Sequence, residues 1–496
     1  MAKTYSNYID GKWVKSESGK TFDNINPATG EMLCRFQAST QKDVLKAVTA
    51  AEKAFAPWKN TPAPKRGEIL YKAARIMEER KEELAKMLTQ ENGKNMDESR
   101  GEIQEGIDIT LYVAGEGRRL FGETTPSELS NKFCMTIREP VGIIGMITPW
   151  NFPFAIPAWK IPPALVAGNC IVFKPSSDAP WLGARLVEIL EEAGLPPGVL
   201  NMVTGSGGVV GKEIANNPKI DGLSFTGSTS TGKDIYAAGA ARLAGVGLEM
   251  GGKNPQIVLK DADLDLAVDG AIWGGFGTAG QRCTATSRLI IEKAVLDKFT
   301  QKFVQRVRNI KVGNGLDKGV LTGPIINGKQ KDKILAYIKI GKEEGAKLLT
   351  GGNALEEGKY GKGNFIEPTV FTNVKKTMTI AQEEIFGPVV SIMPVSDFEE
   401  AIEVANSTEY GLSASIYTND VTKAFRAMRM LESGIVYVNA PTIGAEAHMP
   451  FGGIKNTGNG KREAGSEAIK EFTELKSIFV DYSGGLQRAQ IDIGKK

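Results

Sequence analysis

From residue 141 onward, short apolar runs alternate with segments of helical spacing, and this alternation limits the possible folds more than any other feature. The apolar runs cover 141–147, 170–175, 199–203, 222–226 and 246–250, and helices are expected near 157–166, 179–194, 207–216 and 228–240. Strands that are apolar throughout are typical of parallel sheets covered by helices on both faces. This part of the chain is therefore predicted to form an open, doubly wound α/β domain of the Rossmann type.

A second α/β series follows from about Pro255. Its candidate strands are 287–292, 389–395, 412–418 and 434–439, separated by helices near 263–273, 295–309, 328–345, 397–406 and 420–432. The first 120 residues are expected to be mostly helical. Two pieces with β character, 122–139 and 473–482, fit neither series, and we expect them to pair into a small separate sheet that contacts another subunit.

Histidine and cysteine are scarce, which excludes several kinds of site. The chain has one histidine, His448, and four cysteines, at positions 34, 134, 170 and 283. A single histidine excludes multi-histidine metal sites, and a Ser-His-Asp triad would need His448 itself. No two cysteines have C-x-x-C spacing, so we expect no metal site. We expect each cysteine to be a free thiol, as in a reducing cytosol.

The charge of the chain is close to balance, with 61 basic and 58 acidic residues. No run of Lys and Arg suggests a nucleic-acid partner. The N-terminal residues lack a basic region followed by an apolar one, and no uninterrupted run of about 20 apolar residues is present. We therefore expect a soluble cytoplasmic protein that does not bind membranes.

Cys283 differs from the other three cysteines in its surroundings. It ends the glycine-rich run GGFGTAGQRC (274–283), where the backbone can approach a ligand closely. A buried, inert thiol is the expected role of Cys34, Cys134 and Cys170. With one histidine in the chain, a reactive Cys283 would need assistance from a carboxylate acting through water, or from the local field.

Four further segments follow predicted strands, where open α/β sheets bind ligands, and each has two interpretations. FTGSTSTG (225–232) either binds a phosphate at a helix N-terminus or only caps that helix. Lys174 either contacts a ligand or is a solvated surface lysine. Asn151 either donates to an oxyanion or forms an Asx turn before proline. Glu249, in an apolar strand, is either a general base with a raised pKa or the partner of a lysine.

Taken in order along the chain, seven segments resemble motifs of the NAD(P)-dependent aldehyde dehydrogenase superfamily. They are TPWNFP (148–153), KPSS (174–177), FTGSTSTG (225–232), LEMGGKNP (248–255), GQRC (280–283), EEIFGPV (383–389) and PFGG (450–453). Each motif alone is weak, but seven in order with family-like spacing are specific, and the resemblance covers nearly the whole chain.

The resemblance implies an aldehyde dehydrogenase-like α/β fold with three parts. These are a discontinuous cofactor-binding domain (1–120 and 141–250), a catalytic domain (251–450) and a bridging or oligomerisation element (121–140 and 470–496), with 451–469 returning to the first domain. The family forms homo-dimers and homo-tetramers through the bridging pieces. The residues from Gly485 onward extend beyond the matching pattern.

The resemblance also implies a role for each matching residue. Cys283 would attack the aldehyde carbon, and the Asn151 amide with the Cys283 N–H would hold the oxyanion. Glu249 would activate the water that hydrolyses the thioester. The implied cofactor-binding residues are Trp150, Lys174, Ser177, Gly227, Ser228, Glu384 and Phe386. The candidate substrate residues are Phe152, Arg282 and Phe451.

Two positions bear on the subclass. Relatives that form acyl-CoA lack the glutamate found here as Glu249, so its presence favours water as the acyl acceptor and a free acid as product. Where members that prefer NAD commonly carry a glutamate, this chain has Ser177, which can donate to a 2′-phosphate while Lys174 offers charge. We therefore expect NADP to be accepted, with NAD also usable.

The segment 439–465 resembles the bacterial and archaeal branch that oxidises 2-oxoglutarate semialdehyde, also called 2,5-dioxopentanoate. An acidic aldehyde would need a cation near the mouth of the pocket, for which Arg282 and Lys160 are candidates. Succinate semialdehyde or a general aliphatic aldehyde is the alternative substrate. His448, close to PFGG, either lines the entrance or is a polar loop residue.

Two functions of other classes compete with this prediction. One is a catalytically idle family member that serves as a structural protein, and the other is an acyltransferase or thioesterase with no redox step. Idle members often lose a catalytic residue, whereas Cys283, Glu249 and Asn151 are all present. The cofactor motifs argue against a thioesterase.

Overall fold

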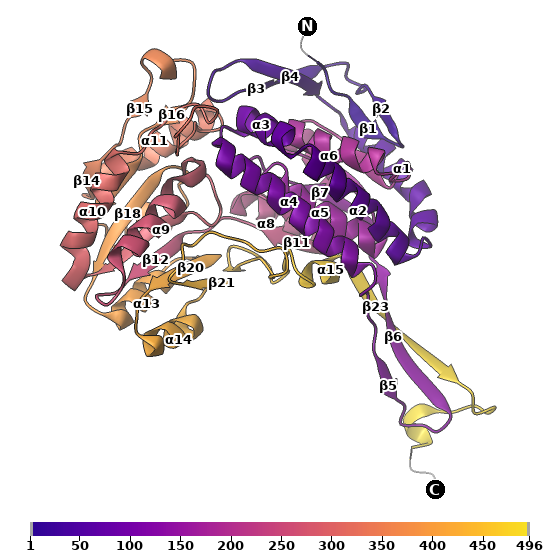
Figure 1. Ribbon diagram of the computed structural model, residues 1–496. Coiled ribbons are helices and arrows are strands. Elements are labelled where there is room, and N and C mark those ends of the chain that lie inside the picture. The colour runs from indigo at the N-terminus through magenta and orange to yellow at the C-terminus, as the bar shows by residue number, and fades with distance from the viewer. Residues whose placement is uncertain (1–2, 494–496) are drawn as a thin grey trace.

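The computed structural model describes residues 3–493, which form two lobes and a projecting arm (Figure 1). Each lobe contains a seven-stranded sheet, with strand order β11-β10-β7-β8-β9-β1-β2 in the first and β14-β17-β18-β13-β12-β20-β21 in the second. The predicted α/β fold class is therefore confirmed. The predicted domain boundaries stay predictions.

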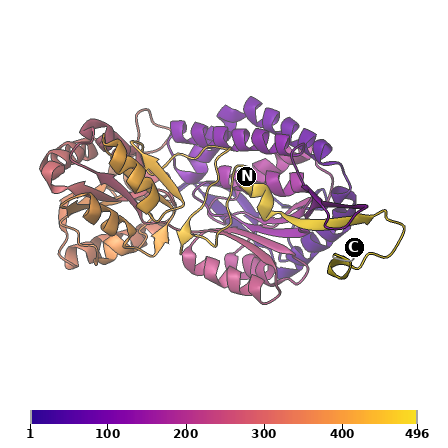
Figure 2. The same cartoon turned by 90° about the horizontal axis from the view of Figure 1, so that it is seen from below.

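The first sheet is parallel through five consecutive strands, from β11 at one edge to β9. These are β7 (Ile143–Ile147), β8 (Cys170–Lys174), β9 (Leu200–Met202), β10 (Gly222–Thr226) and β11 (Gly245–Glu249). The strands alternate with α5 (Ala155–Ala167), α6 (Trp181–Glu192), the π-helical turn η1 (Gly207–Gly211) with α7 (Lys212–Asn216), and α8 (Thr229–Ala240). Helices cover both faces of this sheet (Figure 2), as the apolar runs predicted.

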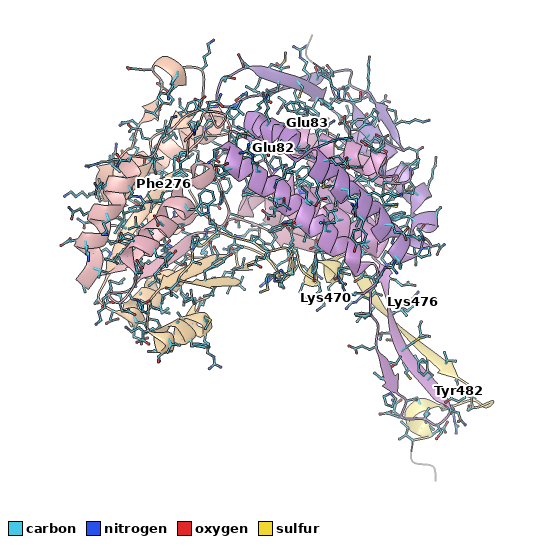
Figure 3. All side chains as sticks on the ribbon, in the orientation of Figure 1. Glu82, Glu83, Phe276, Lys470, Lys476 and Tyr482 are labelled. Carbon is cyan, nitrogen blue, oxygen red and sulfur yellow. The ribbon has the colours of Figure 1, made fainter. Side chains whose placement is uncertain are left out.

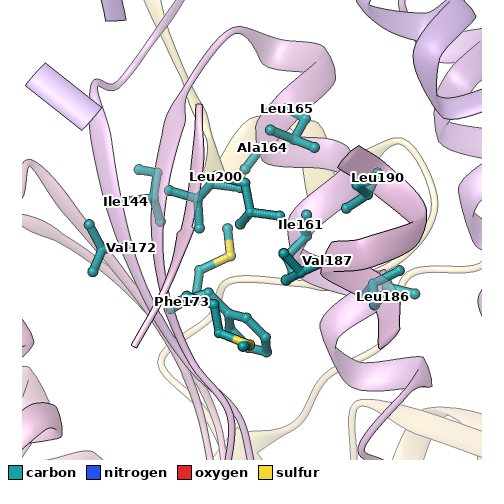
Figure 4. Close-up of a cluster of buried hydrophobic side chains, with 14 of the residues drawn as sticks. Ile144, Ile161, Ala164, Leu165, Val172, Phe173, Leu186, Val187, Leu190 and Leu200 are labelled. Atoms are coloured by element: carbon teal, nitrogen blue, oxygen red, sulfur yellow. The ribbon is translucent and has the colours of Figure 1, made fainter. Parts of the chain in front are cut away.

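The core of the first lobe forms where apolar strand residues meet α5 and α6 (Figure 4). Side chains of the strands pack against both helices, and all are at most 2% exposed: Ile144, Val172, Phe173 and Leu200 from the strands, Ile161, Ala164 and Leu165 from α5, Leu186, Val187 and Leu190 from α6. Burying each large side chain contributes about 1.5–3 kcal/mol. This packing fixes the helices against the sheet.

The N-terminal region differs in part from the expectation of mostly helical structure. Four helices are present, α1 (Gln41–Lys59), α2 (Ala63–Glu79), α3 (Lys81–Asn92) and α4 (Met96–Glu116). Before them, however, lie β1 (Asn7–Ile9) and β2 (Lys12–Val14), and the hairpin of β3 (Thr21–Ile25) and β4 (Met32–Gln37). The expectation was wrong for these residues because β1 is held by pairing with the distant β9, a contact that local periodicity does not report.

The second lobe contains the four strands predicted after Pro255 and three that were missed. Its sheet is formed by β12 (Asn254–Val258), β13 (Thr286–Glu292), β14 (Lys347–Thr350), β17 (Thr369–Thr372), β18 (Val389–Val395), β20 (Ser413–Tyr417) and β21 (Ile435–Val438). Its helices are α9 (Leu264–Phe276), α10 (Leu296–Arg308), α11 (Gly328–Glu343), α12 (Thr379–Gln382), α13 (Phe398–Asn406) and α14 (Val421–Met430). The missed strands are β12, β14 and β17.

Small elements complete this part of the chain. Two short antiparallel pairs are β15 (Ala354–Leu355) with β16 (Phe365–Ile366), and β19 (Tyr410–Gly411) with β22 (Ile454–Lys455). Single 3₁₀ turns are η2 (Gly277–Gly280), η3 (Lys293–Val295), η4 (Gly358–Tyr360) and η5 (Ala489–Ile491). Among the described residues, no helix is both long and apolar enough to span a membrane.

The arm confirms that the two pieces with β character, 122–139 and 473–482, pair with each other. Strands β5 (Thr124–Pro126), β6 (Lys132–Pro140) and β23 (Thr473–Asp481) form an antiparallel sheet in the order β23-β6-β5. Its register runs from Thr473 opposite Pro140 to Asp481 opposite Lys132. The short helix α15 (Glu467–Glu471) leads into β23, and Figure 3 places Lys476 and Tyr482 along the arm.

Candidate active site

Four of the predicted site segments meet at the carboxyl edge of the first sheet. In the strand register, Ile147 lies beside Lys174 on one side and Phe225 on the other, and Thr226 lies beside Glu249. The segments that begin with Thr148, Lys174, Thr226 and Glu249 therefore leave the sheet at one edge. This is the edge at which open α/β sheets bind ligands.

The second lobe contributes residues that precede its strands. Cys283 lies just before β13, and Glu384 lies before β18. Asn254, the first residue of β12, donates its side-chain amide to the carbonyl oxygens of Cys283 (2.8 Å) and Ala285 (2.9 Å). Because residues 250–253 connect β11 directly to β12, the two lobes are joined at this point.

Two cavities meet at Cys283. The larger has a volume of about 730 Å³ and the smaller about 140 Å³. Thr226, Met250 and Cys283 line both cavities. Cys283 therefore borders two cavities, which allows two different molecules to lie beside it.

The smaller cavity gathers most of the predicted cofactor residues. Five of the seven predicted cofactor residues line it, together with the predicted catalytic residues Asn151 and Cys283; the five are Trp150, Gly227, Ser228, Glu384 and Phe386. The rings of Trp150 and Phe386 meet edge to face, with their centroids 5.4 Å apart. A Glu384 carboxylate oxygen accepts from the Gly252 N–H at 3.0 Å, and a side chain on Gly251 would collide with that carboxylate. A larger residue at position 251 would therefore displace the Glu384 carboxylate.

Lys174 and Ser177 do not line this cavity, although both lie at the same sheet edge. The Lys174 ammonium is buried and donates to the carbonyl of Pro175 at 3.1 Å. Burial lowers the pKa of Lys174 to about 8. The Ser177 hydroxyl donates to the carbonyl of Gly205 at 2.7 Å. Lys174 thus carries a buried charge with only one carbonyl partner among the described residues.

The larger cavity contains all three candidate substrate residues, Phe152, Arg282 and Phe451, together with His448. Arg282 donates to Glu98 at 2.6 Å, and its guanidinium lies 4.9 Å from the centre of the Trp273 ring. His448 lies in the wall of this cavity, and it is also a loop residue whose side chain is 59% exposed.

Arg282 and Lys160 were the two candidates for a cation near the mouth of the pocket. Lys160 does not have this role. Its side chain is fully buried, forms an ion pair with Glu463 and donates to the Ser224 hydroxyl at 2.8 Å. It does not line the larger cavity, whereas Glu463 does. The helical position of Lys160 on α5 directs it to this internal partner, leaving Arg282 as the candidate cation.

Glu249 lies in the wall of the larger cavity with neither carboxylate oxygen hydrogen-bonded within the described residues. Burial raises the pKa of Glu249 well above its usual range, the nearby Glu463 raises it further, and Lys160 partly opposes the shift. The sequence left open whether Glu249 was paired with a lysine. The unpartnered carboxyl instead favours a group that can accept a proton when its pKa is reached.

As a residue, Cys283 is partly exposed, whereas Cys34, Cys134 and Cys170 are buried. Burial of its sulfur, and then the nearby Glu384 and Glu249, raise the pKa of the thiol to about 12. Hydrogen bonds from the backbone N–H groups of Thr284 and Cys283 lower this pKa and partly oppose the rise. Asn151 is buried and lines the smaller cavity together with Cys283.

A model of the aldehyde dehydrogenase family matches residues 13–478. The chain belongs to the aldehyde dehydrogenase family. It is similar to the alpha-ketoglutaric semialdehyde dehydrogenase of Bacillus subtilis (strain 168), with 46% identity over 478 residues, covering 96% of this chain and 98% of the relative. It is also similar to the 2,5-dioxopentanoate dehydrogenase of Saccharolobus solfataricus, with 42% identity over 481 residues, covering 96% and 99%.

Solved structures of the family agree with the fold. A crystal structure of betaine aldehyde dehydrogenase from Staphylococcus aureus in complex with NAD+ superposes with a TM-score of 0.95 at 37% identity. The match covers 98% of this chain and 96% of the other. The family and fold expected from the seven motifs are thereby confirmed.

The residues of this aldehyde dehydrogenase fit a nicotinamide dinucleotide. The buried Lys174 ammonium, with a single carbonyl partner, has donors left for hydroxyl groups of a ribose. Ser228 caps α8, a helix of 12 residues whose first N–H groups suit a phosphate. Trp150 and Phe386 supply apolar walls beside Cys283, and Glu384 offers a carboxylate to a second ribose.

Several cavity residues were not predicted from the sequence. Thr226 and Met250 line both cavities and lie inside the recognised motifs, so the motifs could have identified them. Gln330 and Lys333 line the smaller cavity from α11, and Glu98 lines the larger one from α4. Nothing in the local sequence of those helices distinguishes these three residues from ordinary surface positions.

Proposed function

We propose that this enzyme oxidises 2-oxoglutarate semialdehyde to 2-oxoglutarate, with NADP+ or NAD+ as hydride acceptor and water as acyl acceptor. The observation that carries the proposal is the position of Cys283 at the junction of two cavities. The names of the relatives from Bacillus subtilis and Saccharolobus solfataricus support the substrate. Succinate semialdehyde or a simple aliphatic aldehyde is the alternative.

In the proposed reaction, the Cys283 thiolate adds to the aldehyde carbon from the larger cavity. A carbon–sulfur bond forms, the carbonyl π bond breaks, and its electron pair moves to oxygen. The Asn151 side-chain amide and the Cys283 N–H donate to this oxyanion. One such donor is worth about 2.7–4 kcal/mol in related acyl chemistry.

A bound nicotinamide cofactor supplies the acceptor for the hydride that leaves the hemithioacetal carbon. The residues that would hold it are Trp150, Lys174, Ser177, Gly227, Ser228, Glu384 and Phe386, most of which line the smaller cavity. Ser177 and Lys174 together tolerate a 2′-phosphate, because neither repels an anion. This supports the use of NADP+ as well as NAD+.

Glu249 then removes a proton from water, whose oxygen attacks the thioester carbon. The carbon–sulfur bond breaks, Cys283 leaves as a thiolate, and the acid is released. The buried carboxyl of Glu249 has the raised pKa that a general base of this kind needs. Hydrolysis by Glu249 supports a free acid, rather than an acyl-CoA, as the product.

Arg282 is the proposed anchor for the carboxylate of the substrate. Its Nε donates to Thr278 and its Nη2 to Glu98, while its Nη1 makes no hydrogen bond within the described part of the chain. The donors on Nη1 can therefore bind an acidic aldehyde in the larger cavity. Phe152 and Phe451 line the same cavity and would contact the aliphatic part of the substrate.

We also propose that the protein is a cytoplasmic homo-dimer or homo-tetramer that associates through the arm. Several apolar side chains on the arm are exposed, including Phe133, Leu475, Phe479 and Tyr482. Monomeric proteins rarely expose apolar patches of this kind.

The test is the formation of reduced cofactor, followed at 340 nm, with a panel of aldehydes and both cofactors. We expect the highest kcat/KM with 2-oxoglutarate semialdehyde, turnover with both NADP+ and NAD+, and no turnover by Cys283→Ala. A higher kcat/KM with succinate semialdehyde or hexanal would overturn the substrate assignment. The absence of turnover with every aldehyde would overturn the function.

A further inference from the structure

The loop that leads to Cys283 contains three consecutive residues in the left-handed region. Thr278 has φ 51°, Ala279 has φ 53° and Gly280 has φ 67°. Only glycine adopts this conformation without strain, so Thr278 and Ala279 need contacts that hold them there. The strained turn ends three residues before Cys283, and its shape sets where the thiol lies.

Glu98, on helix α4 of the first lobe, reaches this turn. Its Oε1 atom accepts from the Thr278 hydroxyl at 3.1 Å and from Arg282 Nη2 at 2.6 Å. Arg282 Nε in turn donates to Thr278 Oγ1 at 3.0 Å. The three side chains therefore form a closed triangle that spans the turn, from its first left-handed residue to the residue before Cys283.

Glu98 is itself fixed in place. Its other carboxylate oxygen, Oε2, accepts from Asn95 Nδ2 at 2.9 Å, and its backbone N–H donates to Asn95 Oδ1 at 2.9 Å. Asn95 Nδ2 also donates to the carbonyl of Leu321 in the second lobe at 3.1 Å. The Glu98 side chain is only 1% exposed. A buried carboxylate on a helix, bonded at both oxygens, is a rigid support.

We propose that Glu98 is a positioning residue that holds the left-handed turn and thereby keeps the Cys283 thiol at the junction of the two cavities. The inference rests on the proposed function, in which Cys283 is the nucleophile. Glu98 acts through Thr278 and Arg282 and does not itself touch the reacting atoms.

Loss of this support has a specific consequence. When the turn relaxes, Thr278 and Ala279 leave the left-handed region and the thiol moves away from the N–H groups of Cys283 and Thr284. Both aldehyde attack and alkylation of Cys283 should then slow, because a small misplacement of reacting groups costs up to about 100-fold in rate. Cofactor affinity should change little, since Glu98 does not line the smaller cavity.

The test compares Glu98→Met, which removes both acceptors, with Glu98→Gln, which keeps an acceptor without the charge. The second-order rate constant for alkylation of Cys283 by iodoacetamide, read by mass spectrometry, and kcat should both fall about tenfold or more in Glu98→Met. Glu98→Gln should recover both to within about threefold of the unmodified enzyme. The dissociation constant for NADP+ should stay within about twofold in each variant.

Thr278→Val is the second variant, because it removes the two sides of the triangle that Thr278 makes and leaves the buried ion pair of Glu98 with Arg282 intact. It should lower the alkylation rate and kcat about threefold or more. Glu116→Gln is the matched control, since Glu116 is a largely buried carboxylate at the far end of α4 that pairs with Arg119. The control should change neither quantity.

Unchanged alkylation and kcat in Thr278→Val and in folded Glu98→Met would overturn the inference. A rise in KM for the aldehyde with unchanged kcat and unchanged alkylation would also overturn it, because Glu98 would then act only in substrate binding. Failure of the proposed function is distinguishable, since Cys283→Ala would then retain aldehyde turnover. The alkylation measurement uses no aldehyde and reports on the turn alone.

Discussion

The titratable side chains at the site show what burial does at the scale of single residues. Burial raises the pKa of Cys283 to about 12 and that of Glu249 well above its usual range, and it lowers the pKa of Lys174 to about 8. At neutral pH a pKa of about 12 keeps the Cys283 thiol protonated, and a pKa of about 8 leaves the Lys174 ammonium charged. The raised pKa of Glu249 favours its protonated form more than in an exposed carboxyl group.

Lys174 gives a pH dependence that distinguishes the two cofactors. Because its pKa is lowered to about 8, its charge is present below that pH and is lost as the pH rises through it. We predict that kcat/KM for NADP+ falls more steeply than kcat/KM for NAD+ above pH 8, since only NADP+ carries the 2′-phosphate. Lys174→Met should remove the difference between the two profiles. Parallel profiles in the unmodified enzyme would contradict this role for Lys174.

At the scale of elements, strands could be predicted from the sequence where a strand is buried along its length and therefore appears as an apolar run. The strands β7, β8, β10 and β11 are buried along almost their whole length, so they appear as short apolar runs. Strands β1, β14 and β17 have three or four residues, too few to establish a period, and depend on pairing with distant strands. Their existence is a tertiary property that local periodicity does not contain.

The site was predictable to the extent that its residues lie in recognisable motifs. Cys283, Glu249 and Asn151 could be named as candidates because each follows or ends a distinctive segment. The register of the first sheet explains why the segments of Asn151 and Glu249 converge. The contacts of Glu98 and Lys160 could not be predicted, because both residues lie on helices, where a charged residue usually faces solvent. Their buried partners, Arg282 and Glu463, are 184 and 303 residues away in sequence.

The buried carboxylate of Glu102 on α4 binds both the start of α5 and the side chain of Lys94, and it gives a prediction at this scale. One Glu102 oxygen accepts from the Phe154 and Ala155 N–H groups at the start of α5, and the other pairs with Lys94. Both side chains of the pair are at most 1% exposed. Removing one partner of such a pair leaves a buried unpaired charge, which costs about 3–5 kcal/mol.

We therefore predict that Glu102→Gln lowers the free energy of unfolding by about 3–5 kcal/mol, measured by urea denaturation. The amide keeps an acceptor for the two N–H groups but leaves the Lys94 ammonium without a carboxylate. The double variant Lys94→Met with Glu102→Gln should recover part of the loss, because no unpaired charge then remains. Equal destabilisation of the single and double variants would show that the charge of Lys94 is not the cause.

At the scale of the whole molecule, the arm is the part least explained by a single chain. It extends away from both lobes (Figure 1), and β23 exposes Leu475 and Phe479 to solvent. A second subunit would cover these side chains. We predict that Leu475→Asp with Phe479→Asp shifts the protein to a monomer in size-exclusion chromatography with light scattering, without loss of helical circular dichroism. An unchanged molar mass would exclude this face of the arm as the contact.

The two lobes divide the proposed chemistry between them. The first sheet ends at most of the residues proposed to hold the cofactor and at Glu249, while the second lobe supplies Cys283 and Glu384. Neither lobe alone contains both the thiol and the base. The central claim is that the enzyme reduces its cofactor while Cys283 becomes acylated, and that Glu249 then hydrolyses the acyl group.

The most direct test is the time course of reduced cofactor in Glu249→Gln, mixed with excess aldehyde and NADP+ in a stopped-flow instrument. The account predicts a rapid burst of about one reduced cofactor per active site, followed by a steady rate at least about 100-fold below that of the unmodified enzyme. Mass spectrometry should find the acyl group on Cys283. Steady turnover equal to that of the unmodified enzyme, with no acyl group on Cys283, would contradict the account.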